Sequence, residues 1–468
     1  MRELKPDICV IGGGSAGLTV AAAAASFGMD VVLAERGKMG GDCLNYGCVP
    51  SKALIAAAKH AHMARDGARF GVQAEPRVDY AAVHAHVHRA IAAIAPHDSV
   101  ERFEGLGVTV LTEHARFTDE RTVEAGDARI RARRFVIAAG SSPMVPPIEG
   151  LADCAPLTNE TVFDLTELPA RLVVVGGGPI GSELAQAFAR LGSDVTVVEA
   201  ATILSKEDPQ AAAVVRAALI ADGVTLLEDT KVERCRKEGD EAVLVLGDGR
   251  EIRAERILVA TGRRPNLDGL GLDAAGIART GAGITVDSGL RTSNRRVFAI
   301  GDVTGGLQFT HVAGHQGSLA VRAIVFRMPV SYDPDLMPRA TYTAPELAQV
   351  GLTEAEAKAR EPRATAWTAP LEQNDRAQAD AETDGFVKLV LDGKGRLVGA
   401  TIVAPNAGDL VATYALALSA KVKLSAIAGF VPAYPTFAEA GKRAAVARFA
   451  ERLDRRWLRR VLRMVRRL

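Results

Sequence analysis

The chain has 468 residues, 48% of them hydrophobic, which is enough for two to four domains with buried cores. Its 57 lysines and arginines balance 56 aspartates and glutamates, and a net charge of +1 excludes a global field that would recruit nucleic acid. No signal-peptide pattern and no apolar run of membrane-spanning length is present. We therefore expect a cytoplasmic protein without nucleic-acid partners.

The chain opens with a nucleotide-binding pattern. A strand at 8–11 turns through glycines into a helix at 18–27, and a second strand at 31–34 ends in an acid. In the dinucleotide-binding fingerprint, three glycines permit a tight turn, close approach of the pyrophosphate and helix packing. The acid accepts hydrogen bonds from the ribose hydroxyls of the nucleotide. These roles fall to Gly12, Gly14, Gly17 and Glu35.

Two cysteines follow this unit and precede an alanine-rich helical run. Cys43 and Cys48 are two of only five cysteines. We expect both thiols on one helical turn, where oxidation closes a strained, accessible disulfide that serves as a redox device. A structural metal pair is the alternative, but no second Cys/His pair with zinc-like spacing follows.

A helix over 80–105 and short strands over 108–125 are expected next. The helix carries His84, His86 and His88. A copper or zinc site is conceivable, but His86 faces away from the other two at helical spacing. We interpret these histidines as a solvated polar face and predict no metal site.

The nucleotide-binding pattern then returns with identical spacing, in strands at 172–175 and 195–198 around a helix at 182–191. The repeat implies a second dinucleotide, held by Gly176, Gly178, Gly181 and Glu199. Each unit is also followed by a strand that ends in small residues and a glycine, which lets the chain cross close to a cofactor. These glycines are Gly140 and Gly262.

The last third changes character. The segment 297–303 is expected to be a strand that ends in Gly301 and Asp302. Asp302 is suited either to accept hydrogen bonds from sugar or ribityl hydroxyls or to cap a helix. Antiparallel strands are expected at 342–351, 386–391 and 397–403, with helices at 408–419 and from 438 onward. No glycine-rich phosphate loop occurs here, which indicates a third domain with another task.

In this order the motifs resemble the flavin-dependent pyridine nucleotide-disulfide oxidoreductases, a group that contains dihydrolipoamide dehydrogenase, glutathione reductase and mercuric reductase. The resemblance covers essentially the whole chain and implies an α/β fold with two Rossmann-like domains, for FAD and NAD, and a C-terminal α+β dimerisation domain. The expected boundaries are 1–149 and 274–337 for FAD binding, 150–273 for NAD(P)H binding, 338–446 for dimerisation and 447–468 for a basic amphipathic helix.

The resemblance also implies residue roles. Cys48 would be the charge-transfer thiol beside the flavin, and Cys43 the outer thiol that reacts with substrate. Lys52 and Glu183 match a family ion pair beside the flavin, where a cation stabilises the reduced, anionic form. The FAD site would also include Gly140, Asp302 and Ala313, and the NAD site Gly262. A homodimer follows, because in this family the partner's C-terminal domain completes the active site.

Cofactor choice rests on the acid of the second repeat. Glu199 would accept from the free ribose hydroxyls of NADH and repel the 2′-phosphate of NADPH. Ala200 and Ala201 offer no arginine for that phosphate. We therefore expect NADH in preference to NADPH, although mercuric reductases usually prefer NADPH.

The substrate is indicated by the residue before Pro435. Family members that act on organic thiols have a histidine there and a glutamate beyond, as an acid/base pair. Here Tyr434 replaces the histidine and Glu439 remains. Tyrosine resembles the mercuric reductases, as does the segment 308–313, and a soft metal ion binds thiolates without a protonated leaving thiol. Yet the sequence ends in Arg466, Arg467 and Leu468 where mercuric reductases have a cysteine pair, and we expect no N-terminal metal-binding domain of the mercuric reductase kind.

We therefore expect electrons to pass from NAD(P)H through FAD to the Cys43/Cys48 disulfide, and on to a small-molecule disulfide or a thiol-bound soft metal ion. The enzyme would act on a sulfur group or on a metal ion. The alternatives are dihydrolipoamide dehydrogenase, which Tyr434 disfavours, and a flavin redox sensor of low turnover. The other three cysteines, Cys9, Cys154 and Cys235, are interpreted as packing or surface residues without a catalytic role.

The C-terminus is strongly basic, with nine arginines from 448 to 467 at helical spacing with apolar residues. Such a helix can lie on an anionic membrane surface, here the inner face, or it can pack on the dimer with its arginines solvated. The second interpretation is preferred.

Overall fold

The computed structural model describes residues 1–453, 464 and 466. Internal contacts divide the chain into two compact units, of which the first comprises Met1–Gly176, Ala187–Val198 and Thr230–Pro334, and the second Gly177–Gln186, Glu199–Asp229 and Asp335–Leu468. Within the described residues, no helix has both the length and the apolar character needed to cross a bilayer.

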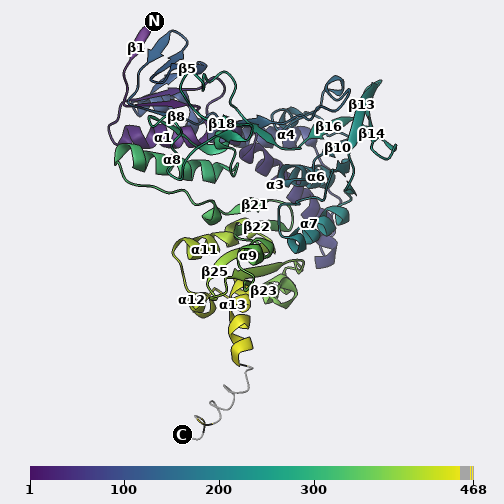
Figure 1. Ribbon diagram of the computed structural model, residues 1–468. Helices are drawn as coiled ribbons and strands as arrows, with labels where there is room; N and C mark the ends of the chain where they lie inside the picture. The colour runs from purple at the N-terminus through teal and green to yellow at the C-terminus, as the bar shows by residue number, and fades with distance from the viewer. Residues whose placement is uncertain (454–463, 465, 467–468) are drawn as a thin grey trace. The chain divides into compact units, whose positions relative to one another are not determined.

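The first unit contains a five-stranded parallel sheet, seen at the left of Figure 1 where β8 is labelled. Its order is β20 (Val297–Ala299), β8 (Arg134–Ile137), β2 (Ile8–Ile11), β3 (Val31–Ala34) and β4 (Thr109–Leu111). The helices α1 (Ser15–Ser26) and α8 (Thr310–Val325) pack together on one face, where Val10 and Phe298 join their core. The continuous apolar strands suit a sheet that is buried on both faces.

A small sheet covers the other face. Its order is β1 (Arg2–Leu4), β7 (Ala128–Ile130), β6 (Thr122–Ala125) and β5 (Ala115–Asp119). Phe117 of β5 and Phe135 of β8 meet edge to face with ring centroids 5.2 Å apart. The strands expected over 108–125 are therefore divided between two sheets, because β4 joins the parallel one.

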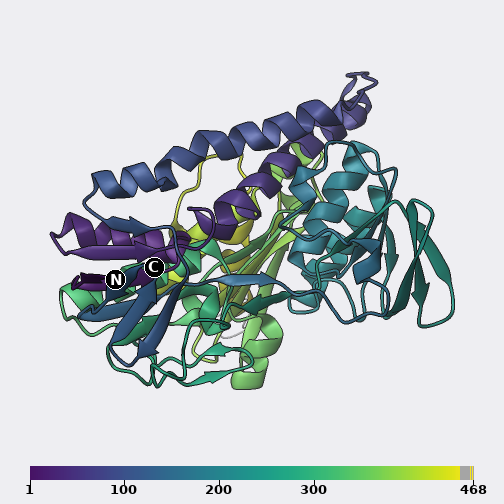
Figure 2. The same ribbon diagram turned by 90° about the horizontal axis from the view of Figure 1, so that it is seen from above.

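The helix expected over 80–105 is interrupted. It forms α4 (Tyr80–Ile94), the 3-10 turn η2 (Ala95–Asp98) and α5 (Val100–Gly105). Pro96 lies in that turn, where it lacks an N–H for a helical bond, and Ser99 caps α5 by accepting from the amide of Arg102 at 3.2 Å. Helix α4 packs along α3 (Cys48–Asp66), followed by η1 (Gly67–Phe70), and Figure 2 shows the two long helices side by side.

The second nucleotide-binding repeat also has parallel strands, in which β10 (Arg171–Val175) lies between β11 (Asp194–Val198) and β16 (Arg256–Val259). An antiparallel meander follows, with the strands β13 (Val232–Glu238), β14 (Glu241–Leu246) and β15 (Glu251–Ala254). The remaining regular elements of this region are α6 (Pro179–Leu191), α7 (Pro209–Ala221) and β12 (Thr225–Leu227).

The C-terminal part is an antiparallel sheet with helices on it. The strand order is β21 (Arg339–Thr341), β22 (Glu346–Gly351), β25 (Leu397–Ala404), β24 (Phe386–Leu391) and β23 (Thr365–Pro370). The helices that share its core are α10 (Asp375–Ala379), α11 (Ala407–Ser419), α12 (Leu424–Gly429) and α13 (Ala438–Leu453). The predicted fold class, α/β with two Rossmann-like domains and a C-terminal α+β domain, is confirmed. Most of the predicted basic helix at 447–468 lies outside the described residues.

A buried ion pair joins strand β24 to the start of helix α7 in the second unit. The side chain of Lys388 on β24 is 2% exposed, and its Nζ lies 2.7 Å from Asp208 Oδ2 and 3.4 Å from Glu354 Oε2. Asp208 also caps α7, where it accepts from the backbone amides of Gln210 and Ala211. Removal of one partner from such a pair leaves an uncompensated buried charge.

We expect Lys388→Met to lower the free energy of unfolding by about 3 to 5 kcal/mol, since the buried Asp208 would lose its main partner. Adding Asp208→Asn retains a capping acceptor, removes the charge and should restore most of the loss. Urea unfolding of the single and double variants measures both effects. Equal stability of the wild type and the single variant would contradict the prediction.

Candidate active site

The two predicted redox cysteines lie on successive helices, so the expectation of one helical turn is wrong. Cys43 is in the short helix α2 (Gly41–Asn45), and Cys48 is the first residue of α3. Gly47 separates the two helices with a non-helical backbone, φ −126° and ψ −111°, and a Cβ atom there would lie 2.8 Å from Asp42 Oδ2. Both thiols are free, and that of Cys43 is hydrogen-bonded to the sulfur of Cys48.

The residues around the two sulfurs shift the pKa values of the two cysteines in opposite directions, so that only one sulfur is protonated. The hydrogen bond from Cys43, with the Thr310 hydroxyl at 3.3 Å and the Lys52 charge, lowers the pKa of Cys48 to about 6. The same hydrogen bond raises the pKa of Cys43. Cys48 also begins a helix, whose N-terminus favours a negative charge. At neutral pH the reduced pair is therefore a Cys48 thiolate beside a Cys43 thiol.

An ion pair holds the redox segment to the rest of the first unit. Asp42 Oδ1 accepts from Arg263 Nη2 and from Asn159 Nδ2, each at 2.9 Å. The Arg263 side chain is only 10% exposed, and its Nε donates to Ser141 Oγ at 2.8 Å. Ser141 in turn donates to Asp302 Oδ2 at 2.6 Å. This network joins the cysteine segment to one of the predicted FAD ligands.

The crossing segments of the two repeats pair with each other. Gly140 precedes β9 (Ser141–Pro143) and Gly262 precedes β17 (Arg263–Pro265), and these strands are antiparallel partners. Asp302 lies in the turn η5 (Gly301–Thr304), and burial raises the pKa of its carboxyl group. Arg263, Asn159 and Ser141 were not among the predicted site residues. Arg263 directly follows Gly262 in the sequence, so its position was visible. Its contacts with Asp42 and Ser141 become apparent only when the two strands pair in the fold.

The glycine loop of the first repeat forms a cradle into which side chains do not fit. Gly12 has a φ of +112°, and a Cβ atom on it would lie 2.2 Å from the carbonyl oxygen of Ala138. A Cβ atom on Gly41 would lie 2.7 Å from Gly14 Cα, and one on Gly17 would lie 1.9 Å from Gly12 O. No described side chain caps α1, whose free amides suit a pyrophosphate. The residues present therefore fit the dinucleotide FAD.

The second repeat has the same local geometry. Gly176 has a φ of +109°, and a Cβ atom on it would lie 2.6 Å from Ala260 O. Glu199 accepts from the amides of Gly177 and Ala201 at 2.7 and 2.9 Å, as Glu35 accepts from those of Gly13 and Gly37. Gly178 has open space where a Cβ atom would be, and Gly181 is buried in α6. This loop fits a second dinucleotide.

Three further predicted residues lie in helices. Lys52 is one turn beyond Cys48 in α3, and Ala313 is one turn after the start of α8. Glu183 in α6 is 6% exposed and accepts from the Tyr342 amide at 2.8 Å. The ion pair expected between Lys52 and Glu183 stays a prediction, since the two residues belong to different compact units.

The tyrosine at the histidine position has a partner that the sequence did not indicate. Tyr434 Oη donates to Asp375 Oδ2 at 2.9 Å, and this bond raises the pKa of the phenol. The charge of Glu439, on the first turn of α13, raises it further. Tyr434 consequently stays protonated at neutral pH and cannot serve as a general base.

The histidines of α4 differ from the solvated face that was expected. The rings of His84 and His88 contact each other with centroids 4.2 Å apart and their planes tilted by 53°. His88 Nε2 lies 3.3 Å from Phe163 O, while His86 is exposed. In the described part of the chain, no group of three or more His, Cys, Asp or Glu side chains is arranged to hold a metal ion.

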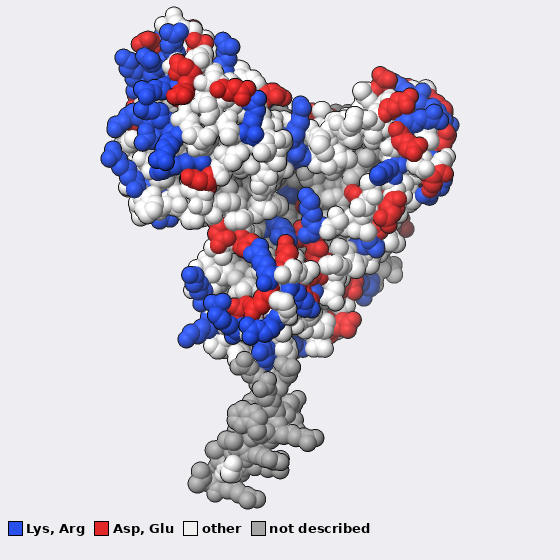
Figure 3. Space-filling view, viewed as in Figure 1, with Lys and Arg blue, Asp and Glu red and all other residues white. Residues whose placement is uncertain are grey.

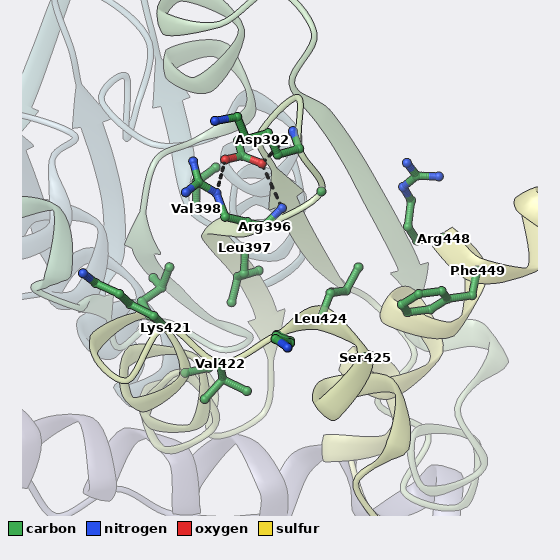
Figure 4. A pocket seen from close by; sticks show the side chains of 15 residues that line it. Asp392, Arg396, Leu397, Val398, Lys421, Val422, Leu424, Ser425, Arg448 and Phe449 are labelled. Atoms are coloured by element: carbon green, nitrogen blue, oxygen red, sulfur yellow. Dashed lines mark hydrogen bonds and ion pairs between the residues drawn. The ribbon is translucent and has the colours of Figure 1, made fainter.

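A cavity of about 630 Å³ lies in the C-terminal domain, between the β24–β25 turn, the end of α11 and α13 (Figure 4). Its walls combine apolar residues with the cations Lys394, Arg396, Lys421, Lys423 and Arg448. Basic side chains also gather over the α12 and α13 end of this domain in Figure 3. The cavity is lined by a different set of residues from the candidate redox site.

Comparisons with known proteins identify the class. Residues 6–317 match the pyridine nucleotide-disulphide oxidoreductase family, and residues 337–445 match its dimerisation domain. The chain therefore belongs to the pyridine nucleotide-disulphide oxidoreductases. It is a flavoprotein oxidoreductase with a redox-active disulfide that uses FAD and a pyridine nucleotide.

Two relatives of similar identity have different activities. The mercuric reductase of Lysinibacillus sphaericus is 36% identical over 454 residues, which cover 95% of this chain and 83% of the relative. The dihydrolipoyl dehydrogenase of Geobacillus stearothermophilus is 35% identical, with 94% and 96% covered.

Two solved structures have the same fold. LpdA from Mycobacterium tuberculosis has a TM-score of 0.87 at 28% identity, covering 96% of this chain and 99% of that one. The Cu(II) complex of the HOCl-induced flavoprotein disulfide reductase RclA from Escherichia coli has a TM-score of 0.84 at 26% identity, covering 93% and 98%.

We expect iodoacetamide to alkylate Cys48 of the reduced, flavin-free protein, in which this residue is exposed, with a pH profile centred near 6, since the thiolate is the nucleophile and its pKa is lowered. Thr310→Val should shift the profile to higher pH, because the hydroxyl that stabilises the thiolate is lost. Thr310→Ser is the matched control and should retain the wild-type profile. Peptide mass spectrometry identifies the alkylated cysteine, and a profile near the ordinary thiol pKa of about 8.5 would refute the assignment.

Proposed function

We propose that this protein is an NADH-dependent reductase that passes two electrons through FAD to the Cys43/Cys48 pair and then to a thiol-bound soft metal ion. The observation that carries the choice of acceptor is the hydrogen bond of Tyr434 to Asp375, which keeps the phenol protonated. The mercuric reductase relatives support this proposal. The second candidate acceptor is a small-molecule disulfide, which the dihydrolipoyl dehydrogenase relative supports.

Cofactor binding is assigned to the two glycine loops. The loop from Gly12 to Gly17 with Glu35 and Asp302 would hold FAD, and the loop from Gly176 to Gly181 with Glu199 would hold NADH. When bound, FAD takes a hydride from the nicotinamide and delivers two electrons to a disulfide. The task of this chain's own residues is then to keep Cys48 deprotonated and Cys43 available to the substrate.

Metal reduction needs no separate general base. A metal ion that arrives with two thiolate ligands exchanges them for the cysteine sulfurs. One displaced ligand leaves as a thiol after taking a proton from the protein, and the other leaves as a thiolate that takes its proton from water. Cys43 supplies such a proton as it binds the metal, so Tyr434 need not accept one. When the sulfur–sulfur bond forms, two electrons leave the cysteine pair and the metal takes them up.

Disulfide exchange makes a different demand. Reduction of an organic disulfide releases a thiolate that must be protonated, and oxidation of a dithiol must deliver a proton to a base. A histidine near its ordinary pKa of about 6.5 does both at neutral pH, whereas a tyrosine whose pKa is raised does neither well. Glu439 is present, but the histidine with which family members pair this glutamate is replaced by Tyr434.

Domain organisation and assembly complete the proposal. FAD would be bound by 1–149 and 274–337, NADH by 150–273, and the homodimer would form through 338–446. The match of residues 337–445 to the family's dimerisation domain supports the homodimer. In that arrangement Tyr434 and Glu439 would serve the active site of the partner subunit.

The first experiment is steady-state NADH oxidation by the FAD-loaded protein with lipoamide, glutathione disulfide, thiol complexes of Hg(II) and Cu(II), and a soluble quinone. We expect turnover on a metal complex to exceed that on either disulfide by at least about a hundredfold, the lower end of the contribution of one general acid or base. Tyr434→His should raise disulfide turnover and leave metal turnover nearly unchanged. Tyr434→Phe is the control for loss of the hydroxyl alone.

Other outcomes of this panel would select the alternatives. Fast turnover on lipoamide by the wild type would favour dihydrolipoamide dehydrogenase and remove Tyr434 as a marker. Full reduction of the flavin with slow oxidation by every acceptor would favour a redox sensor.

Replacement of Glu199, the acid of the second repeat, tests whether the enzyme prefers NADH to NADPH. We expect Glu199→Arg to move the ratio of kcat/KM values toward NADPH by at least about tenfold, because a cation would then face the 2′-phosphate and the repulsive carboxylate would be lost. Glu199→Gln separates loss of charge from gain of a cation. An unchanged ratio would exclude Glu199 from cofactor selection.

A further inference from the structure

Two cysteines outside the candidate active site come together in the fold. Cys154 ends the 3-10 turn η3 (Ala152–Cys154), and Cys235 lies in the middle of β13, far along the chain. Their thiols are hydrogen-bonded to each other, and both are free. Sequence reasoning treated each as an isolated packing or surface residue, because nothing in the linear spacing brings them together.

Backbone contacts, independent of the sulfur atoms, hold the two segments against each other. The Cys235 amide donates to Glu149 O at 2.7 Å, and Glu149 forms a parallel bridge with Arg234. Gly150 has a φ of +71°, and a Cβ atom on it would lie 2.0 Å from Cys235 O. Leu151 is 1% exposed and fixes the same segment in the core. The fold therefore builds the proximity of the thiols, and a glycine is needed for it.

The two thiols differ in accessibility. Cys235 is 5% exposed, and burial raises its pKa to about 12, so its sulfur stays protonated and out of reach of bulky reagents. Cys154 is half-buried and is the sulfur that a small oxidant can reach. By contrast, Cys9 in β2 is fully buried, as a packing residue would be. One accessible thiol beside one sheltered thiol is the arrangement of an oxidisable cysteine with a resolving cysteine.

We propose that Cys154 and Cys235 form a second redox-active dithiol, which closes to a disulfide when hydrogen peroxide oxidises Cys154. The Cys154 thiolate attacks one peroxide oxygen, so that a sulfenic acid forms and hydroxide leaves. The Cys235 thiol then condenses with the sulfenic acid, the sulfur–sulfur bond forms and water leaves. The dithiol loses two electrons and two protons, and the peroxide becomes two water molecules.

The disulfide would restrict the segment of chain that connects the two nucleotide-binding regions. The segment from Glu149 to Cys154 follows β9, and a bond to Cys235 would fasten it covalently to the β13–β15 meander. Such a bond restricts the unfolded chain and resists local opening of the segment. It would also protect Cys154 from further, irreversible oxidation. The proposal does not depend on the acceptor used by Cys43 and Cys48.

The test treats the full-length, FAD-loaded protein with increasing hydrogen peroxide, blocks the remaining thiols and maps its peptides without a reductant. We expect a Cys154–Cys235 linked peptide that disappears on treatment with dithiothreitol. Cys235→Ser should abolish the link and let Cys154 proceed to the sulfinic acid, whereas Cys9→Ser, the control, should leave the link intact. Sulfinic acid at Cys154 of the wild type, or two reduced thiols after Cys43 and Cys48 are oxidised, would overturn the proposal.

A second variant tests whether backbone geometry creates the site. We expect Gly150→Ala to slow formation of the link at least tenfold with both cysteines present, because the new methyl group displaces the segment from β13. Gly239→Ala is a matched control, since Gly239 has a φ of +62° beside the same strand but open space around its Cβ position. Equal rates in the two variants would contradict the geometric origin of the pair.

Discussion

The ion pair between Asp42 and Arg263 is the contact on which the candidate site depends. It fastens the cysteine segment to a strand that begins immediately after the glycine crossing of the second repeat. Through Ser141, the same guanidinium reaches the carboxylate of Asp302. Because Arg263 is nearly buried, the loss of either carboxylate would leave its charge poorly compensated. One side chain thus couples the position of the redox pair to that of a predicted FAD ligand.

The break between α2 and α3 gives the two cysteines unequal chemistry. If both occupied one helix, neither would begin a helix, and their environments would be more alike. Instead Cys48 lies at the N-terminus of α3 near Thr310 and Lys52, and its thiolate is favoured at neutral pH. Cys43 retains the proton. A nucleophilic pair with one stored proton suits an acceptor that binds sulfur directly, as the proposed metal substrate does.

The sequence predicted the fold class well because glycine loops and apolar strands leave local signals. It failed where the outcome depended on distant partners. One miss was local instead: the helix expected over 80–105 ends at Ile94 and starts again at Val100, and the signals for this break, Pro96 and Ser99, lie within the segment itself. The contact of Tyr434 with Asp375 and that of Cys154 with Cys235 have no local signal at all, because each joins separate elements.

The sequence by itself determined the repeated dinucleotide fingerprints, the presence of a cysteine pair next to the first of them, and the replacement of the expected histidine by Tyr434. These features are encoded by residue type and spacing within one short segment. Only the tertiary structure decided which cysteine carries the negative charge, which arginine holds the site together, and that two other cysteines meet. Charge and proximity depend on side chains brought together across the fold, and sequence spacing does not specify those distances.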